Sequence, residues 1–511
     1  MYIWTFSVND TVYYGRTWEE FEKMLDRIEL NCHFKKYIFI HNLSFEFQFL
    51  KGHFKFTDVL ARKSRKVMRC RFEKYNIELR CSYMMSNCAL KYLPNLYKLP
   101  VEKLSGDLDY TKIRNDKTIL TDEELKYCEN DCLVVYYYIK EELKTYNRVD
   151  KIPLTSTGHV RKEFKELIQK DYSYKNKIKK ATNTNPHVYN LLQDCFAGGY
   201  THANWIYTDE IIKNVDSFDF TSSYPYVLVT HKYPSTEFKR CNIQSSKELL
   251  NCFAYILKVK YIKSKYYNNI LSQSKCLKIV DGEYDNGRVI KAKEIEIVVT
   301  DVDFKLLQEF YSFDYEFIEC YYSIYKYLPK QFINFVLDKY VKKTEYKNVE
   351  EKEIEYTKEK NKFNSLYGMS VTNMIKDKVE FNSDLGEWTE IPLTNKEIIE
   401  ALNEEKSKGF LSFAFGVWVT AYARSNLLKN VKLLDDYVIY CDTDSMKLRE
   451  GYNIEVIENY NKFVERKINK VAKILDINVN RFAPKDIFGI SHMLGLFEKD
   501  SHYEEFITQR C

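Results

Sequence analysis

The sequence predicts a multidomain protein in which an α/β part precedes an α+β part. The chain has 511 residues, which is enough for two or three domains. Strand-like runs such as residues 1–8 and 37–40 alternate with amphipathic stretches that are typical of helices. A polar segment containing a proline, residues 182–190, precedes the glycine pair Gly198-Gly199. We therefore expect a linker at 182–190 and a domain boundary near residue 190.

The individual elements follow from local signals. Residues 17–28 and 121–146 each begin with a threonine followed three residues later by a glutamate, which predicts a capped helix. Residues 61–81 alternate polar and apolar side chains and predict one or two strands. In the second half, Asn286-Gly287 lies between alternating runs and predicts a β-hairpin. Residues 324–365 and 394–409 predict further helices.

Composition restricts the class of protein. Hydrophobic residues make up 45% and charged residues 30% of the chain, as in soluble globular proteins, and a net charge of +5 excludes a polybasic nucleic-acid coat. Aromatic residues reach 16% and can fill cores or stack on bases. The 13 cysteines contain no C-x-x-C pair, which argues against zinc and for reduced thiols in a cytoplasm. No signal peptide or apolar run of 18 residues is present, so we expect no membrane contact.

The stretch YVIYCDTDSMKL, residues 437–448, places two carboxylates one residue apart after an apolar run. In extended backbone, Asp442 and Asp444 would point to the same side. Two like charges at such a short distance raise each other's pKa unless a cation neutralises them. A divalent metal ion is the obvious candidate. The alternative is a hairpin tip with two solvated aspartates.

Two other stretches add to this candidate site. In VDSFDFTSSYPYVLV, residues 215–229, a strand-like run reaches Asp219 before the chain turns. Three carboxylates could hold two divalent ions, as in phosphoryl-transfer enzymes, and the oxygen ligands favour Mg²⁺. In KEKNKFNSLYGMS, residues 358–370, a helix would place Lys360, Asn364 and Tyr367 on one face. A cation, an amide and a ring suit a nucleotide, although an ordinary surface face is the alternative.

Together these stretches resemble the three polymerase motifs of family B DNA polymerases. DFTSSYP, KNKFNSLYG and YCDTDS match D-x-x-S-x-Y-P, K-x-x-x-N-S-x-Y-G and Y-x-D-T-D-S in the same order. The segment CFAGGYTHAN, residues 195–204, resembles the linker motif of the protein-primed branch, with Phe196 where tyrosine is usual. The resemblance covers nearly the whole chain.

The resemblance implies roles for the matching residues. Asp219 and Asp444 would ligate Mg²⁺, or Mn²⁺ in its place, with Asp442 beside them and the Phe220 carbonyl as a backbone ligand. Tyr224 would lie under the incoming sugar and exclude a 2′-hydroxyl. The other implied contacts are Lys360 and Lys343 with the triphosphate, Asn364 and Tyr367 with the nascent base pair, and Phe196, Gly198 and Gly199 with DNA.

The N-terminal third resembles the proofreading exonuclease of the same family. HNLSFEF, residues 41–47, has Glu46 where aspartate is usual, and YCEND, residues 127–131, matches Y-x-x-x-D. The implied exonuclease-like residues are Asn42, Phe45, Glu46, Asp107, Tyr127 and Asp131. The family's D-x-E motif is missing before Asn42, and neither K-x-Y nor a thumb follows the last motif. We therefore expect a reading frame that is clipped at both ends. The missing D-x-E motif also argues against 3′–5′ exonuclease activity.

The implied architecture is an RNase-H-like 3′–5′ exonuclease domain at 1–190 followed by a polymerase palm and fingers at 191–511, without a thumb. Insertions near 250–350 and 372–408 would hold a priming protein and encircle DNA. The implied function is a DNA-directed DNA polymerase that transfers dNMP to a 3′-hydroxyl or a priming-protein hydroxyl in viral or plasmid replication. Its partners would be primer–template DNA, dNTPs and a terminal priming protein, in the host cytoplasm. The alternatives are a noncatalytic DNA-binding remnant, one subunit of a split replicase and, weakest, a free-standing exonuclease.

Overall fold

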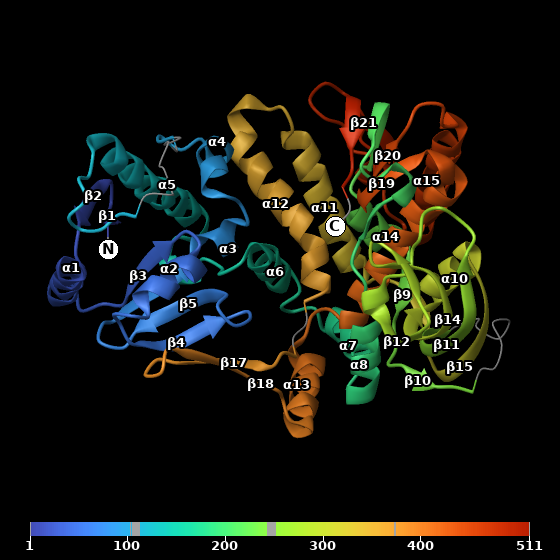
Figure 1. Cartoon of the computed structure of the whole chain (residues 1–511), viewed down its shortest axis with the longest axis horizontal. Helices are drawn as coiled ribbons and strands as arrows, with labels where there is room; N and C mark the ends of the chain where they lie inside the picture. The colour runs from blue at the N-terminus through green and yellow to red at the C-terminus, as the bar shows by residue number, and fades with distance from the viewer. Residues whose placement is uncertain (1, 103, 105–112, 243–251, 373–374, 510–511) are drawn as a thin grey trace. The chain divides into compact units, whose positions relative to one another are not determined.

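The computed structural model describes residues 2–102, 104, 113–242, 252–372 and 375–509 (Figure 1). The chain forms two compact units. The first contains Met1–Glu163, Asn348–Ser365 and Lys376–Leu393, and the second contains Phe164–Lys347, Leu366–Ile375 and Thr394–Cys511. The compact units therefore divide earlier than the boundary expected near residue 190.

The first unit contains a four-stranded mixed sheet in the order β3-β6-β5-β4. Only the β3–β6 pair is parallel among the described pairs of this sheet. The strands of this unit are β1 (Trp4–Val8), β2 (Thr11–Gly15), β3 (Lys36–Ile40), β4 (Phe56–Ala61), β5 (Val67–Phe72) and β6 (Ile77–Cys81). Its helices are α1 (Trp18–Asn31), α2 (Leu43–Leu50), α3 (Ser82–Ser86), α4 (Leu93–Tyr97) and α5 (Asp122–Tyr146). The capping boxes predicted at Thr17 and Thr121 are confirmed.

The expected insertion at 372–408 is divided between the two units. Strands β17 (Lys378–Asn382) and β18 (Glu387–Ile391) form an antiparallel hairpin in the first unit. Its rings Phe381 and Trp388 lie 5.0 and 5.9 Å from that of Phe47, which belongs to the apolar core of the four-stranded sheet. Helix α13 (Asn395–Lys408), with the capping box at Thr394, belongs to the second unit.

The second unit contains two larger sheets that share one apolar core (Figure 1). The five-stranded sheet has the order β21-β8-β20-β19-β7, and every described pair in it is antiparallel. Its strands are β7 (Tyr200–Ala203), β8 (Ile211–Phe220), β19 (Val438–Thr443), β20 (Ser445–Leu448) and β21 (Phe497–Ile507). This sheet carries Asp219 on β8 and Asp442 on β19, and Asp444 lies between β19 and β20.

The six-stranded sheet occupies most of the expected insertion at 250–350. Its strands run in the order β10-β15-β11-β14-β12, with β13 paired to β14. They are β10 (Lys239–Arg240), β11 (Cys252–Ser264), β12 (Cys276–Val280), β13 (Glu283–Asp285), β14 (Arg288–Thr300) and β15 (Tyr311–Tyr322). The hairpin predicted at Asn286-Gly287 is confirmed, with φ angles of 43° and 69°. A separate pair joins β9 (Lys232–Pro234) to β16 (Tyr325–Tyr327).

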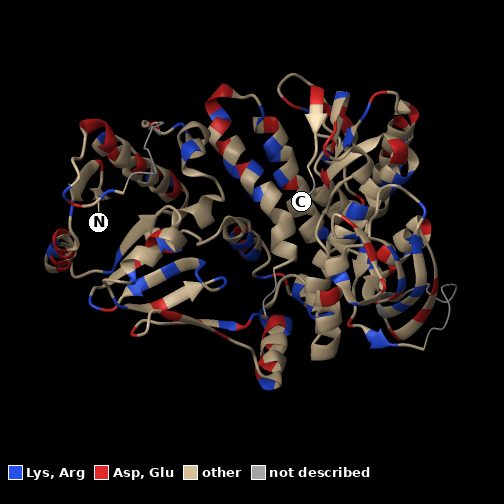
Figure 2. Ribbon diagram, viewed as in Figure 1, with Lys and Arg blue, Asp and Glu red and all other residues tan. Residues whose placement is uncertain are grey.

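The helices of the second unit surround these sheets. They are α7 (Tyr172–Ala181), α8 (Pro186–Cys195), α9 (Ser223–Thr230), α10 (Asp301–Phe310), α11 (Lys330–Tyr346), α14 (Phe413–Leu434) and α15 (Ile454–Leu475). Two further helices cross the division between the units, α6 (Ser156–Leu167) and α12 (Glu353–Ser370). Charged side chains follow one another along α12 and are scarce on α14, which is mostly buried (Figure 2).

The linker expected at 182–190 is wrong, because helix α8 begins inside it. The Asn185 side chain accepts hydrogen bonds from the backbone N–H groups of His187 and Val188. Pro186 occupies the first turn, where its missing N–H costs nothing. The polar residues that indicated a loop are thus the signals of a helix start.

Candidate active site

Strand β8 carries Asp219 between β20 and β21. Phe218 and Phe220 on either side of it are buried in the core, so alternation along the strand directs Asp219 to the opposite face. Asp219 lies opposite Ser445 on β20 and Glu498 on β21. The Phe220 N–H donates to the backbone carbonyl of Asp444 at 3.0 Å, which joins the first and third motifs directly.

Asp442 and Asp444 lie at the turn between β19 and β20, not within one extended strand. Thr443 has φ of 58°, and the Asp444 N–H donates to the Asp442 carbonyl at 2.6 Å. Asp442 is paired with Ser445 across this turn. The expected alternation on extended backbone is therefore wrong, and the hairpin-tip alternative describes the backbone correctly.

The electrostatics differ from those of two solvated aspartates. Burial raises the pKa of Asp444 to about 7, and the charges of Asp219 and Asp442 add to the shift. Burial also raises the pKa of Asp219, with a smaller contribution from the charge of Asp500. The Oδ1 atom of Asp219 is buried without a hydrogen-bond partner. Uncompensated negative charge of this kind is suited to attract a cation.

The carboxylates do not form a complete protein cage for a metal ion. Among the described residues, no three His, Cys, Asp or Glu side chains converge closely enough to hold one. Mg²⁺ is commonly held by one or two carboxylates together with substrate phosphates, while it keeps several waters. The orphaned oxygen of Asp219 and the all-oxygen donor set fit that mode of binding.

Tyr224 lies beside the carboxylates and stacks on Tyr367. Their ring centroids are 4.0 Å apart and the rings are inclined by 9°. Burial raises the pKa of Tyr224 to about 12, and the charge of Asp444 contributes. Lys343 on α11 places its Nζ 3.5 Å from the hydroxyl of Ser222, two residues before Tyr224. The structure thus brings Tyr224, Tyr367 and Lys343 together.

Lys360 and Asn364 lie on α12, whose helical structure is confirmed. Both side chains are exposed, whereas Phe363 and Leu366 on the same helix are buried. Lys360 and Asn364 belong to the first compact unit, and Tyr367 belongs to the second. The nucleotide contacts of Lys360 and Asn364 stay predictions.

The two linker glycines have different surroundings. A Cβ atom at Gly199 would lie 2.8 Å from Thr443, so glycine lets the chain pack directly against the carboxylate turn. A Cβ atom at Gly198 would meet nothing within 4 Å. Arg424 on α14 donates to the carbonyls of Ala197 and Gly198. Phe196 ends helix α8. DNA contact by Phe196, Gly198 and Gly199 stays a prediction.

The exonuclease-like residues lie on two helices of the first unit. Asn42 precedes α2 with φ of 61°, and α2 carries the exposed Phe45 together with Glu46. Tyr127 and Asp131 lie one turn apart on α5. Asp107 lies outside the described residues.

Desolvation alone accounts for the raised pKa of Glu46, with no carboxylate contribution from the part of the chain that is described. The proofreading assignment stays a prediction.

Three residues near the carboxylates were missed at the level of sequence. Thr201 on β7 donates its hydroxyl to Oδ1 of Asp442 at 3.1 Å. Lys447 on β20 contacts the hydroxyls of Ser217 and Ser445 and lowers the pKa of Asp219 and Asp444. Ser445 and Lys447 are two positions apart on one strand, and this spacing could have indicated that Lys447 lies on the same face as Ser445. Asp500 approaches from β21, and no local pattern in the sequence indicated that this strand pairs beside Asp219.

The comparisons with known proteins identify the family of this chain. A family described as DNA polymerase type B, organellar and viral, matches residues 103–463. The DNA polymerase of Bacillus phage B103 is 25% identical over 386 residues, which are 72% of this chain and 60% of the relative. That of Bacillus phage phi29 is 25% identical over 378 residues, 70% of this chain and 58% of the relative. The chain thus spans about three fifths of the length of these relatives.

The fold is also similar to a solved structure. Phi29 DNA polymerase complexed with primer–template DNA superposes with a TM-score of 0.70 at 18% identity, over 98% of this chain and 80% of that one. This likeness supports the multidomain fold of a family B polymerase. Within the described ranges, no helix combines the length and the apolar character that crossing a membrane requires.

Proposed function

The chain belongs to the organellar and viral type B DNA polymerases, and on this premise we propose that it catalyses template-directed transfer of dNMP to a 3′-hydroxyl or to the hydroxyl of a priming protein. One observation carries the proposal: Asp219 on β8 and Asp442 on β19 lie on the two strands that pair with β20, and together with burial their charges raise the pKa of Asp444 to about 7. A site that concentrates negative charge is suited to hold cations against a triphosphate.

Asp219 and Asp444 would hold Mg²⁺ or Mn²⁺, with Asp442 and the Phe220 carbonyl as further oxygen ligands. The bound metal ions would supply charge neutralisation to the phosphates and lower the pKa of the attacking hydroxyl. The protein's own contribution is rigid placement. Phe220 and Asp444 are joined through the backbone, and the tight turn at Thr443 fixes the distance between Asp442 and Asp444.

The stacked rings support the proposed place of the incoming nucleotide. Tyr224 and Tyr367 hold each other in parallel planes beside Asp444, so Tyr224 has little freedom to make room for a 2′-hydroxyl. We propose that this rigidity selects dNTPs over rNTPs. Lys343 and Lys360 would contact the triphosphate, and Asn364 and Tyr367 the nascent base pair.

The proposed partners follow from the family and its relatives. Solved complexes of phi29 DNA polymerase contain primer–template DNA and incoming nucleotides. We propose the same two partners for this chain, with a terminal priming protein bound at the six-stranded sheet, in the cytoplasm of a host cell. The first compact unit would correspond to the exonuclease-like domain and the five-stranded sheet to the palm.

Primer extension by the purified 511-residue chain tests the proposed function. The assay contains primed single-stranded DNA, four dNTPs and Mg²⁺, with Asp444→Ala and Asp219→Ala measured alongside. Because each variant removes a ligand worth several kcal/mol, extension should fall by at least about 10³-fold while the circular dichroism spectrum is unchanged. Equal extension by the variants and the natural sequence would overturn the proposal. DNA binding without extension by the natural sequence would instead favour the noncatalytic alternative.

A further inference from the structure

Successive residues of strand β7 face two different parts of the protein, the carboxylate turn and the core. Its pairing with β19 places Thr201 opposite Asp442 and His202 opposite Cys441. Because successive side chains point to opposite faces, Thr201 faces the carboxylate turn while His202 enters the core. The Thr201 hydroxyl donates to Oδ1 of Asp442 at 3.1 Å, and the Thr443 hydroxyl donates to the same oxygen at 3.1 Å. Both donors therefore hold one oxygen of Asp442 and leave the other for a cation.

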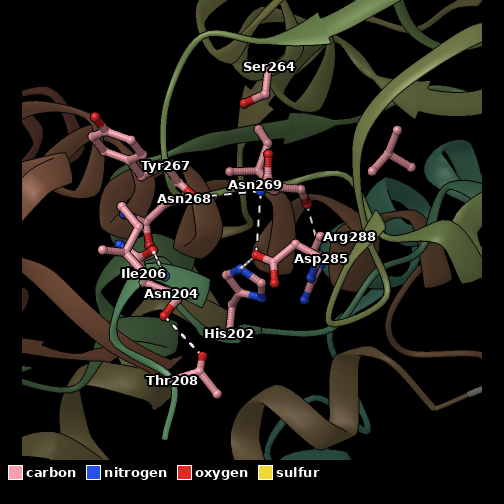
Figure 3. Close-up of polar contacts among 12 residues, drawn as sticks. His202, Asn204, Ile206, Thr208, Ser264, Tyr267, Asn268, Asn269, Asp285 and Arg288 are labelled. Carbon is pink, nitrogen blue, oxygen red and sulfur yellow. Dashed lines mark hydrogen bonds and ion pairs between the residues drawn. The ribbon is translucent and has the colours of Figure 1, made fainter. Parts of the chain in front are cut away.

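The buried face of β7 is held by the β13–β14 hairpin (Figure 3). The His202 Nε2 lies 3.0 Å from Oδ2 of Asp285, and the two side chains are only 1% and 4% exposed. Asn269 approaches the same carboxylate oxygen at 3.5 Å. A buried carboxylate with these partners is satisfied, and it fixes His202 to the tip of the hairpin.

Arg288, which follows the turn between β13 and β14, holds the backbone of β7. Arg288 donates to the carbonyl of Thr201 at 3.1 Å and to that of Ile270 at 3.2 Å. Its guanidinium lies 5.0 Å from the ring centroid of Tyr200. Asp285 and Arg288, which flank Asn286-Gly287, therefore hold two successive residues of β7, one through its side chain and one through its backbone.

The loop at residues 267–269 holds the chain just before β19. Asp435 accepts from the backbone N–H groups of Tyr267 and Asn268 at 2.8 and 3.0 Å and from the Asn268 side chain at 2.9 Å (Figure 3 labels Tyr267 and Asn268). Tyr200 donates its hydroxyl to the carbonyl of Asn269 at 3.0 Å. The entry to β19 and its neighbour β7 are thus fixed by one continuous segment.

We propose that the tip of the β13–β14 hairpin acts through β7 as a positioning device for Asp442, and that Thr201 is the positioning residue that orients this carboxylate for metal binding. The inference rests on the proposed function. The Thr201 side chain is exposed, so its hydroxyl adds little to the stability of the fold. A β-branched valine would serve the strand equally well. Partners that orient a metal ligand are typically worth about 10- to 100-fold in affinity or activity.

The decisive comparison is Thr201→Val against Thr201→Ser. Thr208→Val is the matched control, because its hydroxyl donates to the carbonyl of Asn204 and bonds to no carboxylate among the described residues. Two quantities are measured: the Mg²⁺ concentration that gives half-maximal primer extension, and binding of Mn²⁺ alone, followed by the loss of the free Mn²⁺ paramagnetic resonance signal. Asp442→Ala gives the reference for a lost ligand.

Thr201→Val should raise both the Mg²⁺ requirement and the Mn²⁺ dissociation constant by about 10-fold or more. Thr201→Ser should restore them, and Thr208→Val should match the natural sequence, with the melting temperatures of all three alike. Metal binding by Thr201→Val equal to that of the natural sequence would overturn the inference. So would a loss that the serine variant fails to rescue.

The hairpin is tested separately with Arg288→Met and Asp285→Asn, against Glu283→Gln as the control on the same hairpin. Glu283 is exposed and pairs only with Lys291 among the described residues. If Arg288→Met and Asp285→Asn bind Mn²⁺ more weakly and the control does not, the proposed role of the hairpin in positioning Asp442 is supported. Equal binding by all three variants overturns this role. Because Mn²⁺ binding is read without turnover, a chain that binds Mn²⁺ through Asp442 and fails to extend DNA would refute the proposed function and leave this inference standing.

Discussion

Two tight turns of the second unit, Asp442–Ser445 and Asp285–Arg288, have similar backbones and opposite chemistry. Each joins two antiparallel strands, each contains at least one residue with positive φ, and each begins with an aspartate that contacts β7. At Asp285 the carboxylate is buried and bonded to His202 and Asn269. At the other turn, Asp444 has a pKa of about 7 because burial and two neighbouring carboxylates oppose its charge. A satisfied carboxylate stabilises the fold, whereas an uncompensated one indicates where a ligand binds.

The largest expected effect is that loss of the carboxylate changes stability in opposite directions at the two turns. Asp444→Asn removes a repelled charge, so at pH 8 in EDTA it should stabilise the chain by about 1 kcal/mol while it lowers primer extension by about 10³-fold. Asp285→Ala leaves His202 without its partner and should destabilise the chain by about 1–3 kcal/mol. Thermal unfolding and extension rates check both. A destabilising effect of Asp444→Asn would contradict the comparison.

The next effect is a pH dependence that only one turn should produce. The folded-state pKa of Asp444 lies above its ordinary value. The associated stability is therefore complete below about pH 4 and is lost as pH rises through about 7. Without metal, the free energy of unfolding should fall by about 1–2 kcal/mol between pH 5 and 8, after allowance for solvent screening of a partly exposed group.

This slope should be absent in Asp444→Asn and retained in Asp285→Asn, as measured by urea unfolding in EDTA at four pH values. An identical slope in all three chains would show that other groups dominate. Added Mg²⁺ should flatten the slope of the natural sequence, because a bound cation removes the repulsion.

The difference between the turns also marks what could be predicted from the sequence. Asn286-Gly287 predicted its hairpin because turn chemistry is local. The three motifs singled out carboxylates whose charges act on one another, although the turn at Thr443 replaced the expected extended strand. The partners of these carboxylates could not be predicted, because Thr201 and Asp442 are 241 positions apart and His202 and Asp285 are 83 apart. The helix start at Asn185 was mistaken for a linker because the same polar residues favour both.

A smaller effect distinguishes two glycines at these turns. Gly199→Ala would place a Cβ atom 2.8 Å from Thr443, so the carboxylate turn must move. We expect a loss of about 2 kcal/mol, in the range for overpacking, together with weaker Mn²⁺ binding. Gly287→Ala meets no atom within 4 Å and costs only the strain of φ at 69°, about 1 kcal/mol. Thermal unfolding and Mn²⁺ titration of both variants check this, and unchanged metal binding by Gly199→Ala would show that the turn adapts.

The smallest expected effect concerns Lys447, the cation that partly offsets the charge at the carboxylate turn. Its ammonium group lowers the pKa of Asp219 and of Asp444. Lys447→Met should therefore raise both pKa values and move the acidic limb of the extension rate to higher pH by about half a unit. The control is Lys499→Met on the same sheet, because Lys499 pairs with Asp216 and does not contribute to the shifts at Asp219 or Asp444.

The pH–rate profile of extension by the two lysine variants separates a local charge effect from a general loss of positive charge. A shift in Lys447→Met alone means that the site balances one nearby cation against its three carboxylates. Equal shifts in both variants would assign the effect to the net charge of the sheet. No shift in either would mean that bound metal already fixes the ionised form of Asp444 throughout the measured range, since metal binding requires the deprotonated ligand.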